Sequence, residues 1–286
     1  MGHLPDAPPV ERLHDRVMSS SIESSETFQI PLEAAGAYEE AFVPAFFSQW
    51  APVLCDAAGV TAGQSVLDVA CGTGIVARTA ADLVGPPNVV GVDINEAMLT
   101  VARRVRPDID WRQGDAGALP LPDLTFDAVL CQMALMFFPE RAAALREMGR
   151  VATAGGTVAV LVPSALDVQP AYGALVDMAA RHAGGEARSL LSTYFACGDL
   201  DELRSLFASA GLRVTATRGH TGTARFPSVD ALVATEVEST PLRERISDDV
   251  YERIRLGAHE ALAPFTAADG TLEAPFECHV VTANPQ

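Results

Sequence analysis

Residues 65–74 have the sequence Ser-Val-Leu-Asp-Val-Ala-Cys-Gly-Thr-Gly, and this stretch decides the fold. Its first six residues form a short apolar segment typical of a buried strand. Gly72 and Gly74 follow, and an alanine-rich segment from Thr73 to Val84 has helical character. Glycines at such a turn let the backbone approach a ligand, and the helix behind them directs unpaired N–H groups at it. The stretch predicts a strand, a ligand-binding turn and a helix.

The same alternation of strands and helices continues along the chain. Further strands are expected at residues 89–93, 109–112, 126–131, 157–162, 212–216 and 276–282. Helices are expected after Asn95, which is placed as an N-cap, from Pro139 to about Arg150, and from Asp199 to Ala210. Near-continuous apolar strands alternating with helices predict a parallel sheet covered on both faces. We therefore predict an α/β, doubly wound, mostly parallel seven-stranded sheet of Rossmann-like type.

The remaining segments predict a tail and a helical cap. Residues 1–27 hold three prolines and a serine cluster, which indicates a mobile tail. Apolar residues recur at helical spacing over 28–58, where Pro44 and Pro52 should divide the segment into two short helices. One domain is expected over 28–286. It comprises N-terminal cap helices at 28–58, a cofactor-binding core at 60–162, and two helical cap insertions at 163–198 and 228–262.

Charge and hydropathy exclude several classes of protein. The 286 residues carry 37 acidic and 20 basic side chains, a net charge of −17, which repels phosphate backbones and anionic lipid heads. No apolar run reaches the ~18 residues of a membrane span, and the N-terminus lacks the pattern of a secretory signal. We expect a cytoplasmic protein that binds neither nucleic acid nor membrane.

Cysteine and histidine spacing indicates no metal site. The five cysteines are widely spaced and include no C-x-x-C pair, so reduced cysteines in the core are expected. No acidic cluster or paired histidines suggest a metal ligand set. We expect no metal.

Two further acids follow predicted strands. Asp93 ends the second strand 19 residues after Gly74, close to the ~20-residue offset of an acid that binds ribose hydroxyls. Asp115, within Gly114-Asp115-Ala116, follows the third strand and could accept a hydrogen bond from an exocyclic amine such as that of adenine. The alternatives are a solvated strand-end aspartate and a turn residue, respectively.

These motifs, in this order, resemble those of class I S-adenosylmethionine-dependent methyltransferases. The resemblance covers roughly residues 60–162 and is carried by residues 68–74, 89–93, 114–116, 126–132 and 145–151. It is closest to the small-molecule group that includes the ubiquinone and menaquinone biosynthesis enzymes. The resemblance implies S-adenosyl-L-methionine as cofactor, S-adenosyl-L-homocysteine as product, and in-line methyl transfer to an apolar or aromatic small-molecule acceptor.

The resemblance also implies residue roles. The methionine end of the cofactor would lie against the first turn, the ribose on Asp93, and the adenine between the following helix and the third strand end. Cys131 and Gln132 would lie near the sulfonium, and Tyr38 could close over the cofactor, whereas core packing is preferred for Phe47 and Trp50. The expected cofactor-binding residues are Asp68, Ala70, Gly72, Thr73, Gly74, Asp93, Ile94, Met98, Gly114, Asp115, Ala116, Cys131, Gln132 and Tyr38.

No catalytic base is assigned from the sequence. His182, in the first cap insertion, could face the acceptor, but a packed or surface histidine is the alternative, as it is for His220 in a glycine-rich loop. The sequence Gly72-x-Gly74-x-x-Ala77 also satisfies a relaxed dinucleotide fingerprint. An NAD(P)-dependent oxidoreductase and a non-catalytic cofactor-binding protein therefore stay open, as do the identity of the acceptor and the oligomeric state.

Overall fold

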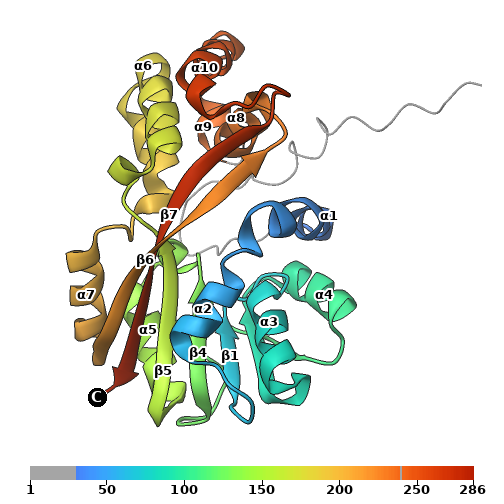
Figure 1. Cartoon of the computed structure of the whole chain (residues 1–286), viewed down its shortest axis with the longest axis vertical. Helices are drawn as coiled ribbons and strands as arrows, with labels where there is room; N and C mark the ends of the chain where they lie inside the picture. Colours follow the sequence, from blue (N-terminus) through green and yellow to red (C-terminus); the bar gives the residue numbers. More distant parts are fainter. Residues whose placement is uncertain (1–29, 239) are drawn as a thin grey trace, which may run out of the picture.

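The centre of the molecule is a seven-stranded sheet with the strand order β3-β2-β1-β4-β5-β7-β6 (Figure 1). The computed structural model describes residues 30–238 and 240–286, so the tail expected at 1–27 lies outside the described residues. Strands β1 to β5 pair in parallel, and β7 is antiparallel to both β5 and β6. The predicted mostly parallel, seven-stranded sheet is thus confirmed. The strands are β1 (Val66–Val69), β2 (Val89–Asp93), β3 (Asp110–Gln113), β4 (Phe126–Gln132), β5 (Ala152–Pro163), β6 (Leu212–Phe226) and β7 (Leu272–Pro285).

Helices cover both faces of this sheet. Alternate strand residues point to opposite faces, so Val66 and Leu130 join one buried cluster while Leu67 and Val129 join the other. The first cluster lies under α2 (Ala51–Ala58), α3 (Ile75–Val84) and α4 (Glu96–Val105), and the second under α5 (Arg141–Val151) and α7 (Leu200–Ser209). The short 3-10 helices η4 (Pro86–Asn88) and η5 (Leu135–Phe137) connect strands to this layer.

Strands β6 and β7 extend well beyond the sheet. Their pairing continues as far as Phe226 opposite Leu272, whereas the pairing of β7 with β5 stops at Pro163 opposite Cys278. The strands expected at 212–216 and 276–282 were therefore too short. The extended parts contain small and polar residues, which do not indicate a strand in the sequence, but antiparallel pairing holds them in strand conformation. His220 therefore lies in β6 rather than in the expected loop.

The extended ribbon carries a group of helices at one end of the molecule (Figure 1). The longest is α6 (Pro170–Ser192), which is kinked at Gly184, and α10 (Asp248–Ala261) packs against it and against α8 (Val229–Val233). More than the two helices expected over 228–262 are present. The shorter elements of this group are η6 (Leu166–Val168), η7 (Thr193–Phe195), η8 (Ala234–Glu238), α9 (Leu242–Arg245) and η9 (Ala263–Phe265).

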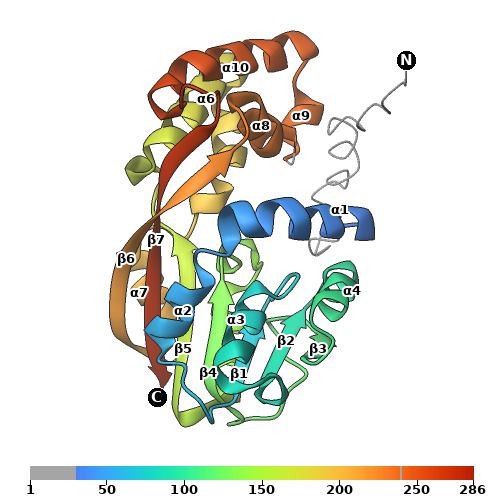
Figure 2. The ribbon, with the colours of Figure 1, turned by 45° about the vertical axis from the view of Figure 1, so that its right-hand side comes forward.

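The N-terminal segment lies between these helices and the sheet (Figure 2). It begins with α1 (Leu32–Ala37) and continues without a break into the π-helix η3 (Tyr38–Phe47), which includes Pro44. The segment thus forms two helical stretches, as expected, but residues 48–50 divide them rather than Pro44, where the wider π-turn tolerates a residue without an N–H donor. Pro52 starts α2 rather than breaking it.

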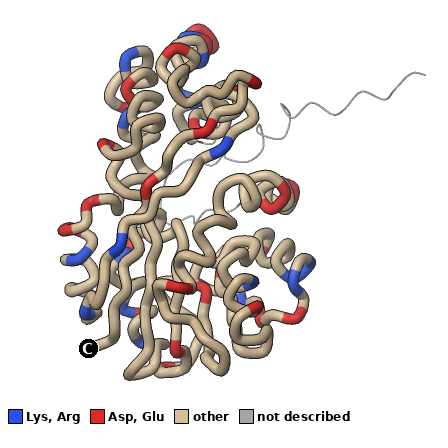
Figure 3. Tube along the Cα trace, in the orientation of Figure 1, with Lys and Arg blue, Asp and Glu red and all other residues tan. Residues whose placement is uncertain are grey.

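Charged residues lie mostly on the helices and loops rather than in the central strands (Figure 3). All five cysteines are buried, as expected for small core residues. None of the described helices is long and apolar enough to cross a bilayer. Among the residues described, no group of three or more His, Cys, Asp or Glu side chains is arranged to hold a metal ion.

Candidate cofactor site

Among the described residues, four of the seven buried polar or charged ones gather at the carboxyl ends of β1 and β2. They are Asp68, Thr73, Asp93 and Asn95. Carboxylates are rarely buried without partners because transfer from water is costly for a charge. Their concentration at one edge of a parallel sheet, where ligands bind in such folds, marks the candidate site.

Asp68 lies in β1 and faces the start of α3. It is 1% exposed, and its Oδ2 accepts a hydrogen bond from the backbone N–H of Ala77 at 2.9 Å. Burial raises the pKa of this carboxyl to about 8; the N–H of Ala77 and the charge of Arg78 act in the opposite direction. The second carboxylate oxygen retains acceptor capacity for a ligand.

Asp93 joins two turns at the end of β2. Its Oδ2 accepts from the N–H of Gly72 and its Oδ1 from the N–H of Asn95, both at 2.8 Å. Asn95 in turn caps α4, accepting from the N–H of Ala97 at 2.8 Å, so the predicted N-cap is confirmed. Burial raises the pKa of Asp93, although these N–H groups oppose the shift. Each oxygen keeps a lone pair that could accept from a ribose hydroxyl.

The turn between β1 and α3 leaves space beside one of its glycines. Gly72 has φ +56° and Gly74 has φ +90°. A Cβ at Gly72 would meet no atom within 4 Å, whereas a Cβ at Gly74 would lie 2.2 Å from the ring of Trp111. Gly72 therefore borders open space, while Gly74 is required by Trp111 packing as well as by its φ. The Oγ1 of Thr73 is buried without a partner among the described residues, which suits a ligand's polar group.

Backbone strain occurs at two strand ends beside the site. In the described part of the chain, three non-glycine residues have left-handed φ values, and two of them, Ala70 (φ +55°) and Met133 (φ +51°), directly follow the ends of β1 and β4. Such conformations cost of the order of 1–3 kcal/mol and cluster at functional sites. Ala70 is partly exposed, which agrees with its placement beside the turn.

The residues that follow β2 and β3 are partly or fully exposed beside the site. Ile94 and Met98 are partly exposed, and Gly114 donates its N–H to the carbonyl of Asp93 at 3.0 Å. Asp115 is exposed, and its Oδ1 accepts from the N–H of Gly117 at 2.8 Å, so it has the turn role that was considered for it. Ala116 packs against the cluster under α5.

The two candidate site residues at the end of β4 face opposite sides of the sheet. Cys131 is fully buried in the cluster under α5, on the face opposite Asp68, and the structure does not bring it to the site. Gln132 points the other way: its Nε2 donates to the carbonyl of Phe47 at 3.1 Å, and its Oε1 is buried with no partner among the described residues.

Tyr38 approaches the site from η3. The charges of Asp93 and Asp68 contribute to raising its pKa, although burial is the larger cause. Glu39 fixes this part of the helix through a two-pronged ion pair with Arg78, at 2.6 and 3.2 Å. Trp50 is a core residue, as preferred, and is 1% exposed.

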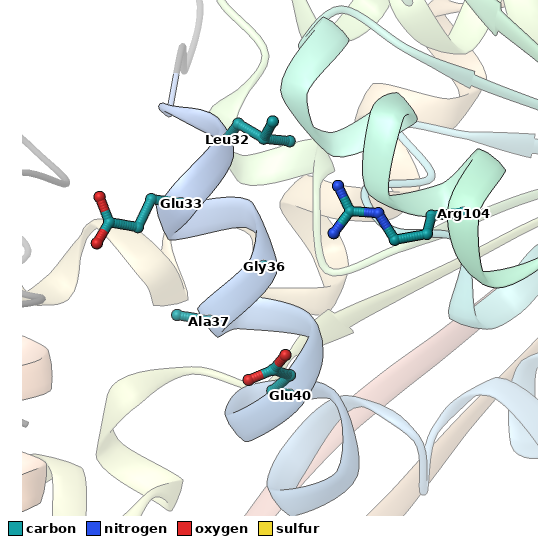
Figure 4. A pocket seen from close by; sticks show the side chains of 6 residues that line it. All are labelled: Leu32, Glu33, Gly36, Ala37, Glu40 and Arg104. Carbon is teal, nitrogen blue, oxygen red and sulfur yellow. The ribbon is translucent and has the colours of Figure 1, made fainter. Parts of the chain in front are cut away.

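His182 does not join this group. It is exposed on α6, near Gly257 of α10. A separate pocket lies between α1 and α4, with Arg104 directed toward α1 (Figure 4). Sequence reasoning missed Trp111, whose ring shapes the glycine turn, since no local pattern marks a cross-strand packing partner.

Comparisons with known proteins identify the family. Residues 67–160 match the family described as methyltransferase domain. The chain is 45% identical over 112 residues to the demethylmenaquinone methyltransferase of Renibacterium salmoninarum, covering 39% of this chain and 46% of that protein. It is 36% identical over 184 residues to the ubiquinone/menaquinone biosynthesis C-methyltransferase of Hahella chejuensis, covering 57% of this chain and 72% of that protein.

The fold agrees with these matches. A putative methyltransferase from Bacillus halodurans superimposes with a TM-score of 0.57 at 21% identity, over 82% of this chain and 99% of that one. The chain spans about half the length of the Renibacterium relative and nearly three quarters of the Hahella relative. This chain belongs to the class I S-adenosylmethionine-dependent methyltransferase family.

Proposed function

We propose that this protein transfers a methyl group from S-adenosylmethionine to a small-molecule acceptor with an apolar or aromatic ring. The observation that carries the proposal is the buried pair Asp68 and Asp93, fixed by backbone N–H groups beside the open turn at Gly72. The names of the two relatives, which refer to quinones, support a ring-containing acceptor.

The residues present fit the cofactor. Asp93 would accept hydrogen bonds from the ribose hydroxyls, Asp68 would face the ammonium of the methionine end, and Thr73 would use its unpartnered Oγ1 on the same end. Ile94 and Met98 would lie against the adenine, with Asp115 at its edge. When bound, S-adenosylmethionine supplies an activated methyl group on a sulfonium.

The protein's own contribution is alignment and exclusion of water. Orientation of two reactants can contribute up to ~7–11 kcal/mol to a displacement. The segments 30–58, 163–198 and 228–262 would form the cap over this edge of the sheet. Gln132 and Tyr38 lie where the cap segment η3 meets the sheet, which makes them candidates to face the reacting atoms.

Methyl transfer can be measured directly. Protein is mixed with S-adenosylmethionine carrying a labelled methyl group and with a panel of hydroxylated aromatic compounds, and products are identified by mass spectrometry. We expect label in at least one acceptor and a strong loss in Asp93→Ala. Cofactor binding without any transfer would favour a non-catalytic role, and absence of cofactor binding would overturn the proposal. An oxidoreductase has no support beyond the glycine spacing and the position of Asp93.

A further inference from the structure

A row of three paired residues connects the edge strand of the sheet to the candidate cofactor site. Asp68 of β1 pairs with Gly91 of β2, and Gly91 pairs with Trp111 of β3. Residues paired in this way carry their side chains on the same face of the sheet. Trp111 is the one buried residue of β3 and is 7% exposed. The lack of a side chain at Gly91 leaves the space over β2 to the indole ring.

The indole ring lies over the middle of β2 and extends to the turn between β1 and α3. A Cβ at Gly91 would lie 2.4 Å from the Cε3 and Cζ3 atoms of the ring, and a Cβ at Gly74 would lie 2.2 Å from its Cη2 atom. The Nε1 of the ring donates a hydrogen bond to the carbonyl of Arg106, the C-cap of α4, at 2.8 Å. This bond fixes the orientation of the ring between the two glycines.

The glycine in the middle of β2 is explained by this ring. The φ of Gly91 lies outside the left-handed region that favours glycine, unlike the φ of Gly74. Glycine inside a strand weakens the strand and marks the close approach of another group. The nearest atoms to a Cβ at Gly91 belong to the Trp111 ring, followed by the Sγ of Cys71 at 3.1 Å. The contact with the indole therefore constrains two positions of the sequence, 74 and 91.

The turn that the ring contacts carries hydrogen bonds to both buried acids. Gly74 is the N-cap of α3, and the N–H of Ala77 in the first turn of that helix binds Asp68. The N–H of Gly72 binds the acid at the end of β2. Thr73 lies between the two glycines and has a buried Oγ1 without a partner among the described residues. A displacement of Gly74 would therefore move all of these groups.

We propose that Trp111 is a positioning residue for the cofactor; this rests on the proposed function. The rigid indole supports Gly74 from the side of β3 and thereby determines where the Oγ1 of Thr73 meets the methionine end of S-adenosylmethionine. Binding groups need support of this kind to stay within about 0.5 Å of their productive positions. Trp111 acts through the turn and makes no contact of its own with the cofactor.

The proposal predicts that Trp111 and Thr73 depend on each other in cofactor binding. Thr73→Val removes the hydroxyl, and Trp111→Leu leaves an apolar side chain that is too short to reach Gly74. In calorimetry, Thr73→Val should weaken S-adenosylhomocysteine binding about tenfold in the wild type and less than about threefold in Trp111→Leu. An equal cost in both backgrounds, zero included, would overturn the proposal, because independent sites have additive effects.

The matched control makes the same kind of substitution in the other buried cluster. Phe207 is 0% exposed and belongs to the cluster under α5 and α7, on the opposite face of the sheet. Phe207→Leu should lower the stability, but it should leave the affinity for S-adenosylhomocysteine within about twofold of wild type and the effect of Thr73→Val unchanged. A loss of affinity as large as that in Trp111→Leu would assign the effect to general destabilisation and contradict the proposal.

Gly91→Ala tests the same contact with the indole retained. The added methyl group would overlap the ring, so this variant should bind S-adenosylhomocysteine about tenfold more weakly than wild type. Adding Trp111→Leu to Gly91→Ala should recover part of the affinity, although Trp111→Leu alone weakens binding. A further loss in place of recovery would count against the contact. If Trp111→Leu does not fold, Thr73→Val should still cost less in Gly91→Ala than in wild type.

Hydrogen exchange in the unliganded protein measures the turn without any cofactor. The N–H groups of Gly72 and Ala77, which bind the two buried acids, should exchange at least about tenfold faster in Trp111→Leu, relative to the amides of β5. Phe207→Leu should not change this ratio. Unchanged exchange of both amides in Trp111→Leu would show that the indole does not hold the turn.

The outcomes distinguish the proposal from the function on which it rests. If the wild type does not bind S-adenosylhomocysteine, the proposed function fails, and the exchange measurement alone decides whether Trp111 holds the turn. If the wild type binds it and the effects of Trp111→Leu and Thr73→Val are additive, the function stands and the role of Trp111 is wrong.

Discussion

The hydrogen bonding of buried polar groups differs between two regions of the molecule. One is the sheet edge formed by β1 and β2, and the other is the interior under the helical cap. At the edge, Asp68 and Asp93 accept hydrogen bonds from backbone N–H groups of the same turns. Under the cap, Gln132, His220 and Trp50 each keep a buried polar atom without a partner among the described residues. The two carboxylates of the first region are fixed before any ligand arrives, and the Oγ1 of Thr73 beside them lacks a partner among the described residues; the second region holds three such atoms. We infer that cofactor recognition is built into the fold and that the acceptor completes the other half.

The largest effect is expected from Asp93→Ala. The change removes the proposed ribose partner and also the acceptor for the N–H groups of Gly72 and Asn95. Binding of S-adenosylhomocysteine should weaken by about 1–3 kcal/mol, measured by calorimetry. The matched control is Asp115→Ala at the exposed turn, where the loss should be several-fold smaller. Equal losses of S-adenosylhomocysteine affinity in the two variants would contradict the proposed difference between the buried sheet edge and the exposed turn.

The buried carboxyl of Asp68 should make stability depend on pH. Its folded pKa of about 8 lies above the ordinary value of 3.8, so the folded state binds the proton more tightly than the unfolded state. This group therefore adds stability at low pH, and the contribution is lost as pH rises from about 4 to 8. Asp68→Asn should flatten the profile and stabilise the protein by about 2 kcal/mol at pH 8.

Urea unfolding of wild type and Asp68→Asn at pH 5 and pH 8 measures this difference. The variant should bind S-adenosylhomocysteine more weakly than wild type although it is more stable at pH 8. Parallel pH profiles for the two proteins would show that Asp68 is not the buried group responsible.

A smaller effect should follow loss of the contact that fixes the N-terminal segment to the ribbon. The Gln49 amide donates to the carbonyls of Phe46 and Thr223, both at 2.9 Å, and accepts from the N–H of Thr223 at 3.0 Å. Gln49→Ala should cost about 1–2 kcal/mol of unfolding free energy and speed proteolysis within 38–58. Ser48→Ala, at the partly exposed neighbouring residue, serves as control. Unchanged proteolysis would mean that other contacts hold the segment.

The smallest effect compares two helix caps, one in each region. Asn95 caps α4 beside Asp93, and Ser247 caps α10 in the helical cap. Replacing either by Ala should cost about 1 kcal/mol of stability. Asn95→Ala should also weaken S-adenosylhomocysteine binding, because the side-chain cap fixes the turn whose backbone N–H binds Asp93, whereas Ser247→Ala should not. Equal losses of S-adenosylhomocysteine affinity in the two variants would contradict the proposed difference between the two regions.

The sequence predicted the sheet because local patterns define it. Short apolar strands, the glycine turn at 72–74 and the Asn95 cap each depend on neighbours in the chain, and the structure confirms these elements. The length of β6 and β7 was missed because cross-strand pairing, rather than composition, extends them.

Cys131 and Gln132 illustrate the limit of motif reasoning. Both were placed near the reacting sulfur, yet adjacent strand residues face opposite sides of a sheet. Cys131 is buried under α5, and only Gln132 turns toward η3. The family resemblance identified the correct strand end. The alternation of side chains along the strand then determines that Gln132, and not Cys131, faces η3.

Calorimetric titration of the whole protein with S-adenosylhomocysteine, and separately with NADH, tests whether the sheet edge recognises the sulfur nucleoside. We predict saturable one-to-one binding of S-adenosylhomocysteine and no heat of binding with NADH. Saturable binding of NADH, together with no response to millimolar S-adenosylhomocysteine, would contradict it.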